Sequence, residues 1–506
     1  MGHRFLLGLD NGGTMVKAGI YGVQGDAAAF ASAQIPSILG KDGYVERDMD
    51  LLWETNCRVI REAVAKAGVE SSDIIGVSVS GHGNGLYLVD KDLRPLMNGI
   101  YSTDMRAKQY VDQLSAAGVL DELFSKTMQT LYPGQFPPLL AWLQDNRPDI
   151  LDKAKWALGC NDYIRLCLTG EANGEITNMS AASVLDQNTR GYDDEILGKM
   201  GIAGCGELLP PLVRSCDICG EVTATAARQT GLCEGTPVAG GLIDLTACAI
   251  ATGLIDESRL CMIAGTWGIN EFLSREPIVS KGLLLTSVYC VDDYYLVTDG
   301  SMTSASNLEW FLGECFDAEN QALSQGQNIY GTANNMVESV DAGDSAVVFL
   351  PFLYGTNVDA DAKSCFLGLS GWHGKAHMLR AVYEGIVFSH RMHMEKLLDL
   401  RDTEPEAIRM AGGVTKSRTW VQMFADILQM PIEISDHTEL GTLGVAMCAG
   451  VAVGEYESLY EAAQVFSKTS YIYRPDRTKK DLYEKKYQLY KRAIERLSPL
   501  WKEWDI

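Results

Sequence analysis

Short apolar runs alternate with helically spaced apolar positions along the first part of the chain. The runs at 5–9 and 16–21 are predicted as strands, and the polar, glycine-rich residues 11–14 between them predict a tight turn. Apolar residues then recur at helical spacing from Leu52 to Ala67, Gly68 is placed to end that helix, and 74–79 returns to a strand. This alternation predicts an α/β chain.

The same order of features returns in the middle of the chain. An apolar, glycine-rich strand is predicted over 237–243, followed by Asp244 and a stretch of small residues at 245–252. The segment 260–272 predicts a second hairpin, with Gly265 and Thr266 in its turn. A strand, a Gly-Thr turn and another strand thus occur near the start of each half. This repeat predicts two similar domains facing a central cleft, 1–245 and 246–506.

The second half carries further helical patterns. Helices are predicted over 303–311, 377–400 and 418–428, separated by glycine-rich turns at 412–413 and 441. The charged, tyrosine-rich segment 479–497 has the same spacing. It is predicted as a closing helix on the exterior, with its charges on a solvated face.

Composition narrows the classes of function. A chain of 506 residues exceeds what one hydrophobic core usually organises, which agrees with two domains. No apolar run approaches the roughly 20 residues that span a bilayer, so we expect no membrane insertion. Lys plus Arg is 43 and Asp plus Glu is 66, and the formal net charge of −23 would repel nucleic acid and anionic lipid. ATP remains an acceptable ligand, because backbone amides and Mg²⁺ can neutralise its phosphates locally.

The cysteines indicate a reducing compartment. There are 13, an odd number scattered through mostly apolar surroundings, which favours reduced thiols over a disulfide framework. Asp10 directly follows a short apolar run at the N-terminus, a pattern that does not match a secretory signal. We therefore expect a cytoplasmic protein. Cys216 and Cys219 form a lone CxxC without a second pair at zinc spacing, so buried thiols are favoured there over metal or redox chemistry.

Residues 10–14, Asp-Asn-Gly-Gly-Thr, offer the chemistry of a nucleotide phosphate clamp. The glycines let backbone N–H groups approach phosphate oxygens, the threonine adds a hydroxyl, and the aspartate can serve Mg²⁺. Lys17 adds a positive charge nearby. A plain hairpin turn explains the same residues equally well.

Three further positions carry candidate chemistry. Asp244 ends an apolar strand, where it could act as a general base, although a helix N-cap is the commoner use of such an aspartate. Gly265 and Thr266 offer amides and a hydroxyl to a phosphate, against a simple turn. Gly412 and Gly413 follow a predicted strand and could let an adenine lie against the backbone, against an ordinary loop.

These elements, in this order, resemble the FGGY family of carbohydrate kinases, within the larger group that includes actin and the Hsp70 ATPase domain. The strongest local likeness runs from 364–369 to 377–384 and is similar to the family's C-terminal signature, although a glycine turn and an amphipathic helix would explain the segment without it. Segments 140–148, 161–170 and 420–426 add to the likeness, which covers nearly the whole chain. It implies two ribonuclease H-like domains.

The resemblance also implies the roles of individual residues. Asp244 would take the proton of the attacking hydroxyl, and Asp10 would position magnesium. The implied ATP-binding residues are Asp10, Gly12, Gly13, Thr14, Lys17, Gly265, Thr266, Gly412 and Gly413. The implied sugar-binding residues are His82, Gly83, Asn84, Asp104, Arg106 and Asp244.

The sugar loop 80–85 departs from D-xylulose kinases. These carry Gly-Gln-Met-His-Gly here, whereas this chain has Gly83 and Asn84 in place of the Met-His pair, which predicts a roomier pocket. The chain looks most similar to the branch that phosphorylates L-xylulose or 3-keto-L-gulonate. D-Xylulose, ribulose, glycerol and other polyols stay as alternative substrates, and relatives in the family often form dimers, which leaves a homodimer open.

Two functions of other classes share parts of the pattern. A non-catalytic actin-like ATPase would use the phosphate clamps but has no need of a sugar loop. A dinucleotide-dependent oxidoreductase also uses glycine-rich turns, but residues 8–13 do not read GxGxxG and a strand, not a helix, follows them.

Overall fold

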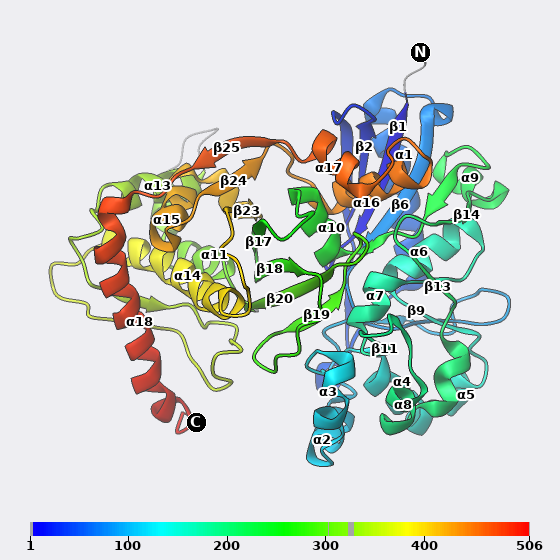
Figure 1. Ribbon diagram of the computed structural model, residues 1–506, viewed down its shortest axis with the longest axis horizontal. Coiled ribbons are helices and arrows are strands. Elements are labelled where there is room, and N and C mark those ends of the chain that lie inside the picture. The colour runs from blue at the N-terminus through cyan, green and yellow to red at the C-terminus, as the bar shows by residue number, and fades with distance from the viewer. Residues whose placement is uncertain (1–3, 302, 322–327, 505–506) are drawn as a thin grey trace. The chain divides into compact units, whose positions relative to one another are not determined.

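The computed structural model describes residues 4–301, 303–321 and 328–504, and it divides into two compact units (Figure 1). The first unit consists of Met1–Ile255, Leu273–Val297 and Glu439–Lys468. The second consists of Asp256–Phe272, Thr298–Thr438 and Thr469–Ile506. The sequence predicted two continuous domains divided after Asp244. In the structure the units are not continuous, because residues 273–297 and 439–468 belong to the first unit.

The first unit is built on a mixed sheet that starts with the predicted hairpin. β1 (Phe5–Asn11) and β2 (Met15–Gly22) pair antiparallel, and β6 (Ile74–Gly81) lies parallel to β1 on its other side. The strand order is β14-β15-β6-β1-β2-β3, and β16 also pairs with β6. The remaining strands are β3 (Ala27–Gln34), β14 (Ile218–Glu221), β15 (Pro237–Ala239) and β16 (Leu242–Ile243). The strand predicted over 237–243 is therefore two short strands, β15 and β16, interrupted at Gly240 and Gly241.

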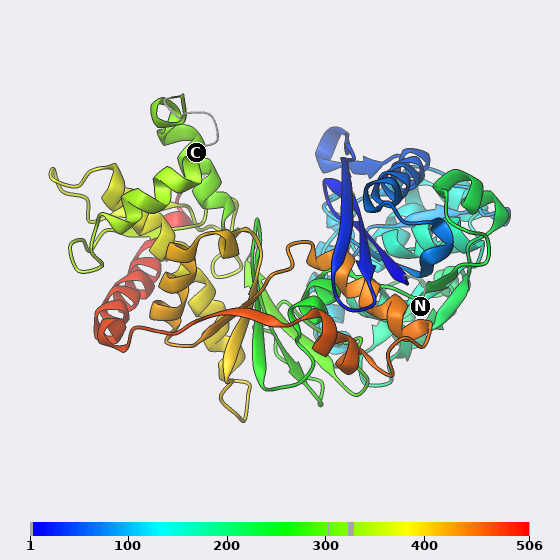
Figure 2. The ribbon, with the colours of Figure 1, turned by 90° about the horizontal axis from the view of Figure 1, so that it is seen from above.

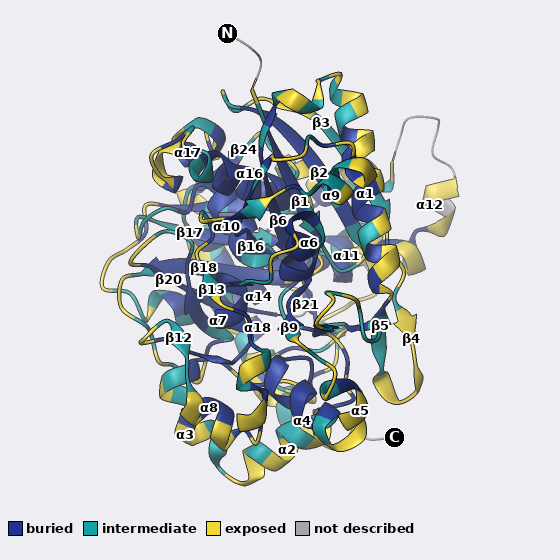
Figure 3. Cartoon of the chain, turned by 90° about the vertical axis from the view of Figure 1, so that its right-hand side faces the viewer, coloured by how far each residue is buried: buried dark blue, intermediate teal, exposed yellow. Residues whose placement is uncertain are grey.

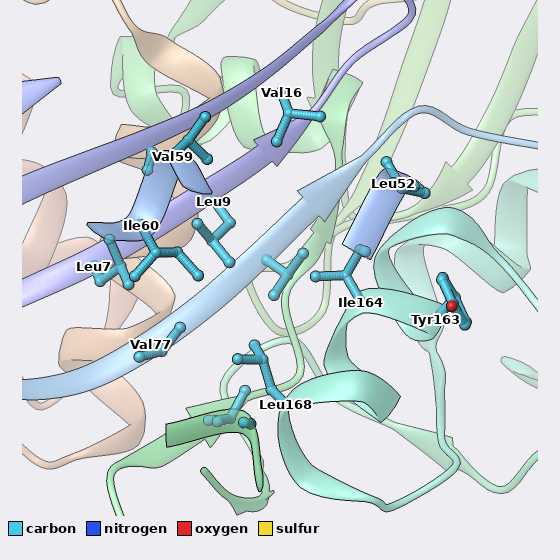
Figure 4. Close-up of a cluster of buried hydrophobic side chains, with 14 of the residues drawn as sticks. Leu7, Leu9, Val16, Leu52, Val59, Ile60, Val77, Tyr163, Ile164 and Leu168 are labelled. Carbon is cyan, nitrogen blue, oxygen red and sulfur yellow. The ribbon is translucent and has the colours of Figure 1, made fainter. Parts of the chain in front are cut away.

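Helix α1 (Met49–Ala67) covers one face of this sheet. Its residues lie as the apolar spacing predicts, the Asp48 side chain accepts from the Leu51 N–H at its start, and Gly68 ends it in the left-handed conformation (φ 65°). Figure 4 shows Val59 and Ile60 of α1 in one buried cluster with Leu7 and Leu9 of β1. Ile164 and Leu168 of α6 (Cys160–Thr169) belong to the same cluster.

Helix α16 (Leu440–Ala452) covers the opposite face. Successive side chains of a strand point to opposite faces, so Gly8 and Asp10 face away from the cluster that holds Leu7 and Leu9. On that side Gly8 lies against Thr442 and Asp10 lies against Gly441, both in α16. Figures 1 and 2 show this orange helix beside the blue strands β1 and β2, although more than four hundred residues separate them in the sequence. Most of α16 is buried, and it appears dark blue in Figure 3.

Below the sheet, the first unit has a second apolar cluster. It includes Leu88 of β7 (Tyr87–Val89), Ala157 of β9 (Trp156–Leu158) and Leu140 of α4 (Phe136–Asn146). Helices α2 (Lys108–Ala116), α3 (Val119–Thr127), α7 (Ile176–Ala181) and α8 (Asp194–Lys199) complete this region. The cluster supports the loops that follow β6 and β8 (Gly99–Ile100).

The second unit repeats the arrangement of the first sheet. β17 (Arg259–Ala264) and β18 (Gly268–Ser274) form the predicted hairpin with Gly265 and Thr266 in the turn, and β23 (Ala407–Ala411) lies parallel to β17. β24 (Ile432–Ser435) and β25 (Thr469–Tyr473) extend the sheet beyond β23. The repeated hairpin is the feature that the sequence predicted, and the structure adds a parallel strand beside the first strand of each hairpin.

The helices of the second unit follow the predicted patterns closely. α15 (Arg418–Leu428) has the predicted bounds, and α14 (Lys375–Leu398) and α18 (Lys480–Trp501) differ from the predictions by a few residues at their ends. α11 (Ser306–Cys315) begins later than the predicted 303, because the Ser304 and Ala305 N–H groups donate to the carbonyls of Thr266 and Gly265. Among the described residues, no helix is long and apolar enough to cross a bilayer.

The close packing of α16 on α10 (Asp244–Thr252) gives a test of the fold. A β-carbon at Gly444 would overlap the carbonyl oxygen of Ala247, which is backbone and cannot rotate away. We expect Gly444→Val to lower the free energy of unfolding by about 1–3 kcal/mol or more, measured by chemical denaturation.

Gly198→Ala is the matched control for this substitution. Gly198 lies in α8, is exposed and has no atom within 4 Å of its β-carbon position, so alanine should be neutral or stabilise by roughly 0.5–1 kcal/mol. Equal stability of wild type and Gly444→Val would contradict the close helix contact.

Candidate active site

The carboxyl ends of three parallel strands meet in the first unit and carry the candidate catalytic residues. Asp10 of β1 lies opposite Ser80 of β6, and Leu242 of β16 lies opposite Ser80 on the other side. β16 ends at Ile243, and Asp244 is the first residue of α10. In open α/β sheets, such strand ends are the usual place for ligands. The structure thus brings Asp10, the sugar loop and Asp244 to one edge of one sheet.

Asp244 has the electrostatics of a proton acceptor near neutral pH. Burial, with the negative charge of Asp10, raises the pKa of its carboxyl to about 7, against the lowering effect of the backbone N–H groups of Leu245 and Gly83. Its Oδ1 accepts from the Leu245 N–H at 2.7 Å. The N-cap position of α10 belongs to Ile243, so the alternative use of Asp244 as an N-cap does not describe its place in the helix.

Asp10 is held by neighbours on both sides. The Ser80 hydroxyl donates to its Oδ1 at 2.9 Å, and Lys17 lies directly opposite it in the β1–β2 pair. Burial raises the pKa of Asp10, whereas Ser80 and Lys17 lower it. Lys17 also donates to Glu439 at 2.7 Å, at the start of α16. Lys17 therefore lies beside the predicted phosphate clamp and also forms an ion pair at the start of α16.

The predicted phosphate clamp is a turn with unused donors. The Gly12 N–H donates to the Met15 carbonyl at 3.0 Å. The N–H groups of Gly13 and Thr14 donate to no group in the described part of the chain, and Thr14 is exposed. Free, adjacent backbone donors beside a carboxylate are what a phosphate and its metal ion require.

Arg47 holds this turn from below, and the sequence reading did not identify it. Its guanidinium is fully buried and donates to the carbonyls of Gly12 at 3.2 Å and Gly13 at 2.5 Å. It also lies over the Tyr101 ring, 4.7 Å from the centroid. Arg47 stands in a run of charged residues before α1, a pattern typical of a solvent-exposed segment, so local sequence gave no signal for this role.

The sugar loop lies next to both aspartates. The His82 N–H donates to the Asn11 carbonyl, and both His82 ring nitrogens have protein partners, the Tyr87 hydroxyl at 2.9 Å and the Gly83 carbonyl at 3.2 Å. Burial and the charge of Arg47 lower the pKa of His82 to about 3, so its ring is neutral at physiological pH.

Asn84 presents an unused acceptor in this loop. It takes the left-handed conformation (φ 62°), which asparagine tolerates better than most residues, and its Nδ2 donates to the Tyr132 hydroxyl. Its Oδ1 is buried and has no hydrogen-bond partner in the residues that the structure describes. A buried acceptor without a donor is costly unless a ligand supplies one. Tyr132 is a second residue that the sequence reading missed.

Asp104 and Arg106 form a buried pair. The Asp104 carboxylate accepts from the Arg106 Nε at 2.8 Å and from the Val45 N–H at 2.6 Å, and Arg106 also reaches Glu46 at 2.8 Å. The guanidinium lies over the Tyr44 ring at 4.2 Å. Both side chains therefore make these contacts within the protein.

In the second unit, the two predicted nucleotide loops lie side by side. β17 and β23 are parallel, with Ile263 opposite Ala411, so the loops after them start at the same edge. Gly412 (φ 96°) lies against the Ala264 carbonyl and the Gly265 N–H, with no room for a side chain. Thr266 and Gly413 are exposed. The structure thus joins the Gly265 and Gly412 loops, which are far apart in sequence.

The carboxylates of the first unit suit a magnesium ion that a nucleotide brings with it. In the described residues no group of three or more His, Cys, Asp or Glu side chains is arranged to hold a metal. Mg²⁺ in phosphoryl-transfer sites commonly binds through one or two carboxylates, with water and substrate phosphates as its other ligands. Asp10 and Asp244, two carboxylates at one edge of the sheet, fit that pattern.

Comparison with known proteins agrees with this geometry. Residues 5–251 match the N-terminal domain of the FGGY family of carbohydrate kinases, and residues 260–453 match its C-terminal domain. The L-xylulose/3-keto-L-gulonate kinase of Escherichia coli (strain K12) is 36% identical over 97% of both chains. A probable L-xylulose kinase of Haemophilus influenzae is 34% identical, covering 98% of this chain and 99% of its own.

A solved structure shows the same fold. The ligand-bound xylulose kinase of Lactobacillus acidophilus superposes with a TM-score of 0.89 at 25% identity, covering 99% of this chain and all of its own. These likenesses bear out the two-domain, ribonuclease H-like fold and do not favour a non-catalytic ATPase or an oxidoreductase. The chain belongs to the FGGY family of carbohydrate kinases.

Proposed function

We propose that this kinase transfers the γ-phosphate of ATP to a hydroxyl of L-xylulose or of 3-keto-L-gulonate. The observation that carries the catalytic part is Asp244, a carboxyl with a pKa of about 7 beside Asp10 at the ends of parallel strands. The substrate part is supported by the activities named for relatives that are 36% and 34% identical along nearly the whole chain.

In this proposal Asp244 accepts the proton of the attacking sugar hydroxyl. Phosphoryl transfer depends on in-line positioning and charge neutralisation, and a base near its operating pH is well matched to take that proton. The free N–H groups of Gly13 and Thr14, with Gly12 and Lys17, bind phosphate oxygens from the first domain, 1–245.

The second domain, 246–506, binds the rest of the nucleotide in this proposal. Gly265 and Thr266 donate to phosphate oxygens, and Gly412 and Gly413 border the adenosine. The contact between the Gly265 and Gly412 loops supports this assignment, because neighbouring loops can bind the phosphates and the adenosine of one nucleotide.

Magnesium is part of the proposal. Asp10 would anchor the ion. Asp244 lies near enough to Asp10 for their charges to interact, so it would also feel the charge of the ion. When bound, Mg²⁺ neutralises charge on the transferred phosphoryl group and orients it.

The sugar loop selects the substrate through hydrogen bonds more than through space. The expected roomier pocket is not supported at Gly83, because the Ile243 side chain lies 2.5 Å from where a β-carbon at Gly83 would be. We propose instead that the free Asn84 Oδ1 accepts from a sugar hydroxyl, with Gly83 close to the sugar. His82, Asp104 and Arg106, whose polar atoms bond within the protein, act in sugar binding by fixing the loops.

Two remaining expectations join the proposal. The 13 cysteines are all free thiols in the structure, which supports a reducing, cytoplasmic setting. A homodimer, for which the resemblance is the support, would be detected by sedimentation or light scattering.

Asp244→Asn tests the catalytic role. We expect kcat to fall by roughly two to four decades while the KM values for ATP and sugar change little, since the amide cannot take the proton. Folded-state stability separates this effect from misfolding. Because the pKa of Asp244 is higher in the folded state, its contribution to folding stability is fully present below the unfolded pKa near 3.8 and is lost as pH rises through about 7. At pH 8 the wild type has lost this contribution, so the asparagine variant should melt no lower than wild type. Near-normal turnover would rule out the general base.

The pH profile gives an independent measurement. Asp244 accepts a proton only when ionised, so kcat/KM for sugar should be flat above pH 7 and fall about tenfold per pH unit below it. The residual activity of Asp244→Asn should lack this step. A wild-type profile that stays flat down to pH 5.5 would contradict the raised pKa.

A coupled ADP-release screen tests the substrate. L-xylulose or 3-keto-L-gulonate should give the highest kcat/KM, with D-xylulose, ribulose and glycerol lower by roughly tenfold to a hundredfold, because one unpaired buried hydroxyl costs about 1–3 kcal/mol. Asn84→Ala should raise KM for the sugar much more than KM for ATP. If D-xylulose or glycerol is preferred by an order of magnitude, the substrate assignment is wrong and the kinase assignment stands.

A further inference from the structure

An open surface cavity lies in the first unit, on segments that the proposed reaction does not use, and most of its lining residues are exposed. Its volume is about 480 Å³, enough for a small metabolite. It is formed after β11 (Leu185–Asp186), after β18, and at the connection between β19 (Leu285–Val288) and β20 (Tyr295–Ser301), all labelled in Figure 1. Its polar lining consists of Asn188, Arg190, Arg275, Glu276, Asp293 and Tyr295.

Two arginines in this cavity are held in place by consecutive tyrosines. The Arg190 guanidinium lies 4.6 Å from the Tyr295 ring centroid, and its Nε donates to the Tyr295 hydroxyl at 3.2 Å. The Arg275 guanidinium lies 4.6 Å from the Tyr294 ring centroid, and its Nη2 donates to the Tyr294 hydroxyl at 2.9 Å. Both tyrosines are buried. Stacking of this kind orients a guanidinium and leaves its other N–H groups available to a ligand.

The charge of the two arginines is not compensated by an ion pair. In the described part of the chain, neither Arg190 nor Arg275 has a carboxylate oxygen within 4.0 Å, although Glu276 and Asp293 line the same cavity. The chain as a whole carries a net charge of −23, so acidic partners for arginine are abundant. Two unpaired guanidiniums in one cavity attract a dianion, and guanidinium groups bind phosphate by paired N–H donors.

Two residues of the lining lie in turns between strands. Arg190 (φ 56°), before β12 (Gly191–Tyr192), and Asp293 (φ 65°), before β20, both take the left-handed conformation that tight turns often require. Here each of the two places a charged side chain on the cavity wall.

We propose that this cavity binds a sugar phosphate, a ligand site separate from the Asp10–Asp244 centre. Arg190 and Arg275 bind the phosphomonoester, and the carboxylates of Glu276 and Asp293, with Asn188, accept from the sugar hydroxyls. The carboxylates favour a sugar phosphate over inorganic phosphate, because the sugar hydroxyls donate to them and offset their repulsion of the phosphate. The site does not depend on which sugar the active site phosphorylates.

Isothermal titration of the full chain with ribose 5-phosphate, ribose and inorganic phosphate tests the proposal. Ribose 5-phosphate should bind more tightly than either of its halves. The double variant Arg190→Gln/Arg275→Gln should weaken its binding by roughly tenfold or more, because two charge-assisted contacts are lost. The control Arg58→Gln/Arg61→Gln removes two exposed arginines of α1, with the same change in net charge, and should bind as wild type. Binding at the active site would be equal in both variants.

Substitution of the two acidic residues of the cavity gives a second variant, which should change the binding of inorganic phosphate in the opposite direction. Glu276→Gln/Asp293→Asn should weaken ribose 5-phosphate but strengthen inorganic phosphate, since it replaces two charged hydroxyl acceptors by weaker neutral ones and removes their repulsion of the phosphate. The ADP-release assay serves as the check of folding, with kcat within about twofold of wild type in all three variants.

Three results would overturn the proposal. They are no ribose 5-phosphate binding by wild type, equal binding by wild type and Arg190→Gln/Arg275→Gln, and tighter ribose 5-phosphate binding after loss of the two acids. Failure of the sugar screen would leave these isotherms unchanged, so the two proposals are tested separately.

Discussion

The parallel pairing of β1, β6 and β16 is the constraint on which the first unit depends. It sets Asp10, Ser80 and the start of α10 at one edge, so two half-buried carboxylates lie together there. Neither carboxylate has an ion pair in the described residues. Placing unpaired carboxylates close together costs folding free energy, and the packing of the rest of the fold must offset that cost. That arrangement is also what raises the pKa of Asp244 to about 7 and suits it to take a proton.

Helix α16 makes this edge rigid from behind. It lies on the face of β1 that carries Asp10, and it begins with Glu439, the partner of Lys17. Its glycines allow the helix to approach β1 and α10 closely, so the position of Asp10 is fixed by backbone contacts and not only by side chains. The chain leaves the first unit and returns to it with residues 439–468, and this late segment packs against the strand that carries Asp10.

Arg47 connects the phosphate turn to the sugar loop. It binds the carbonyls of Gly12 and Gly13, stacks on Tyr101, and its charge adds to the burial that lowers the pKa of His82. The Gly12 and Gly13 carbonyls are thus engaged, whereas the N–H groups of Gly13 and Thr14 donate to no group in the described residues. A single buried guanidinium therefore contacts the 11–14 turn and Tyr101 and acts by its charge on the sugar loop.

The sequence by itself determined the elements, the repeat and the family. The hairpins at β1–β2 and β17–β18, helix α1 with its end at Gly68, and α15 are set by apolar periodicity and turn residues, which are local properties. Only the tertiary structure decided the break between β15 and β16, the role of Arg47, the free Oδ1 of Asn84 and the pairing of Arg190 with Tyr295. Each of these depends on burial or on contacts between residues far apart in the chain, and the pKa of a carboxyl depends on both, so no local pattern could reveal them.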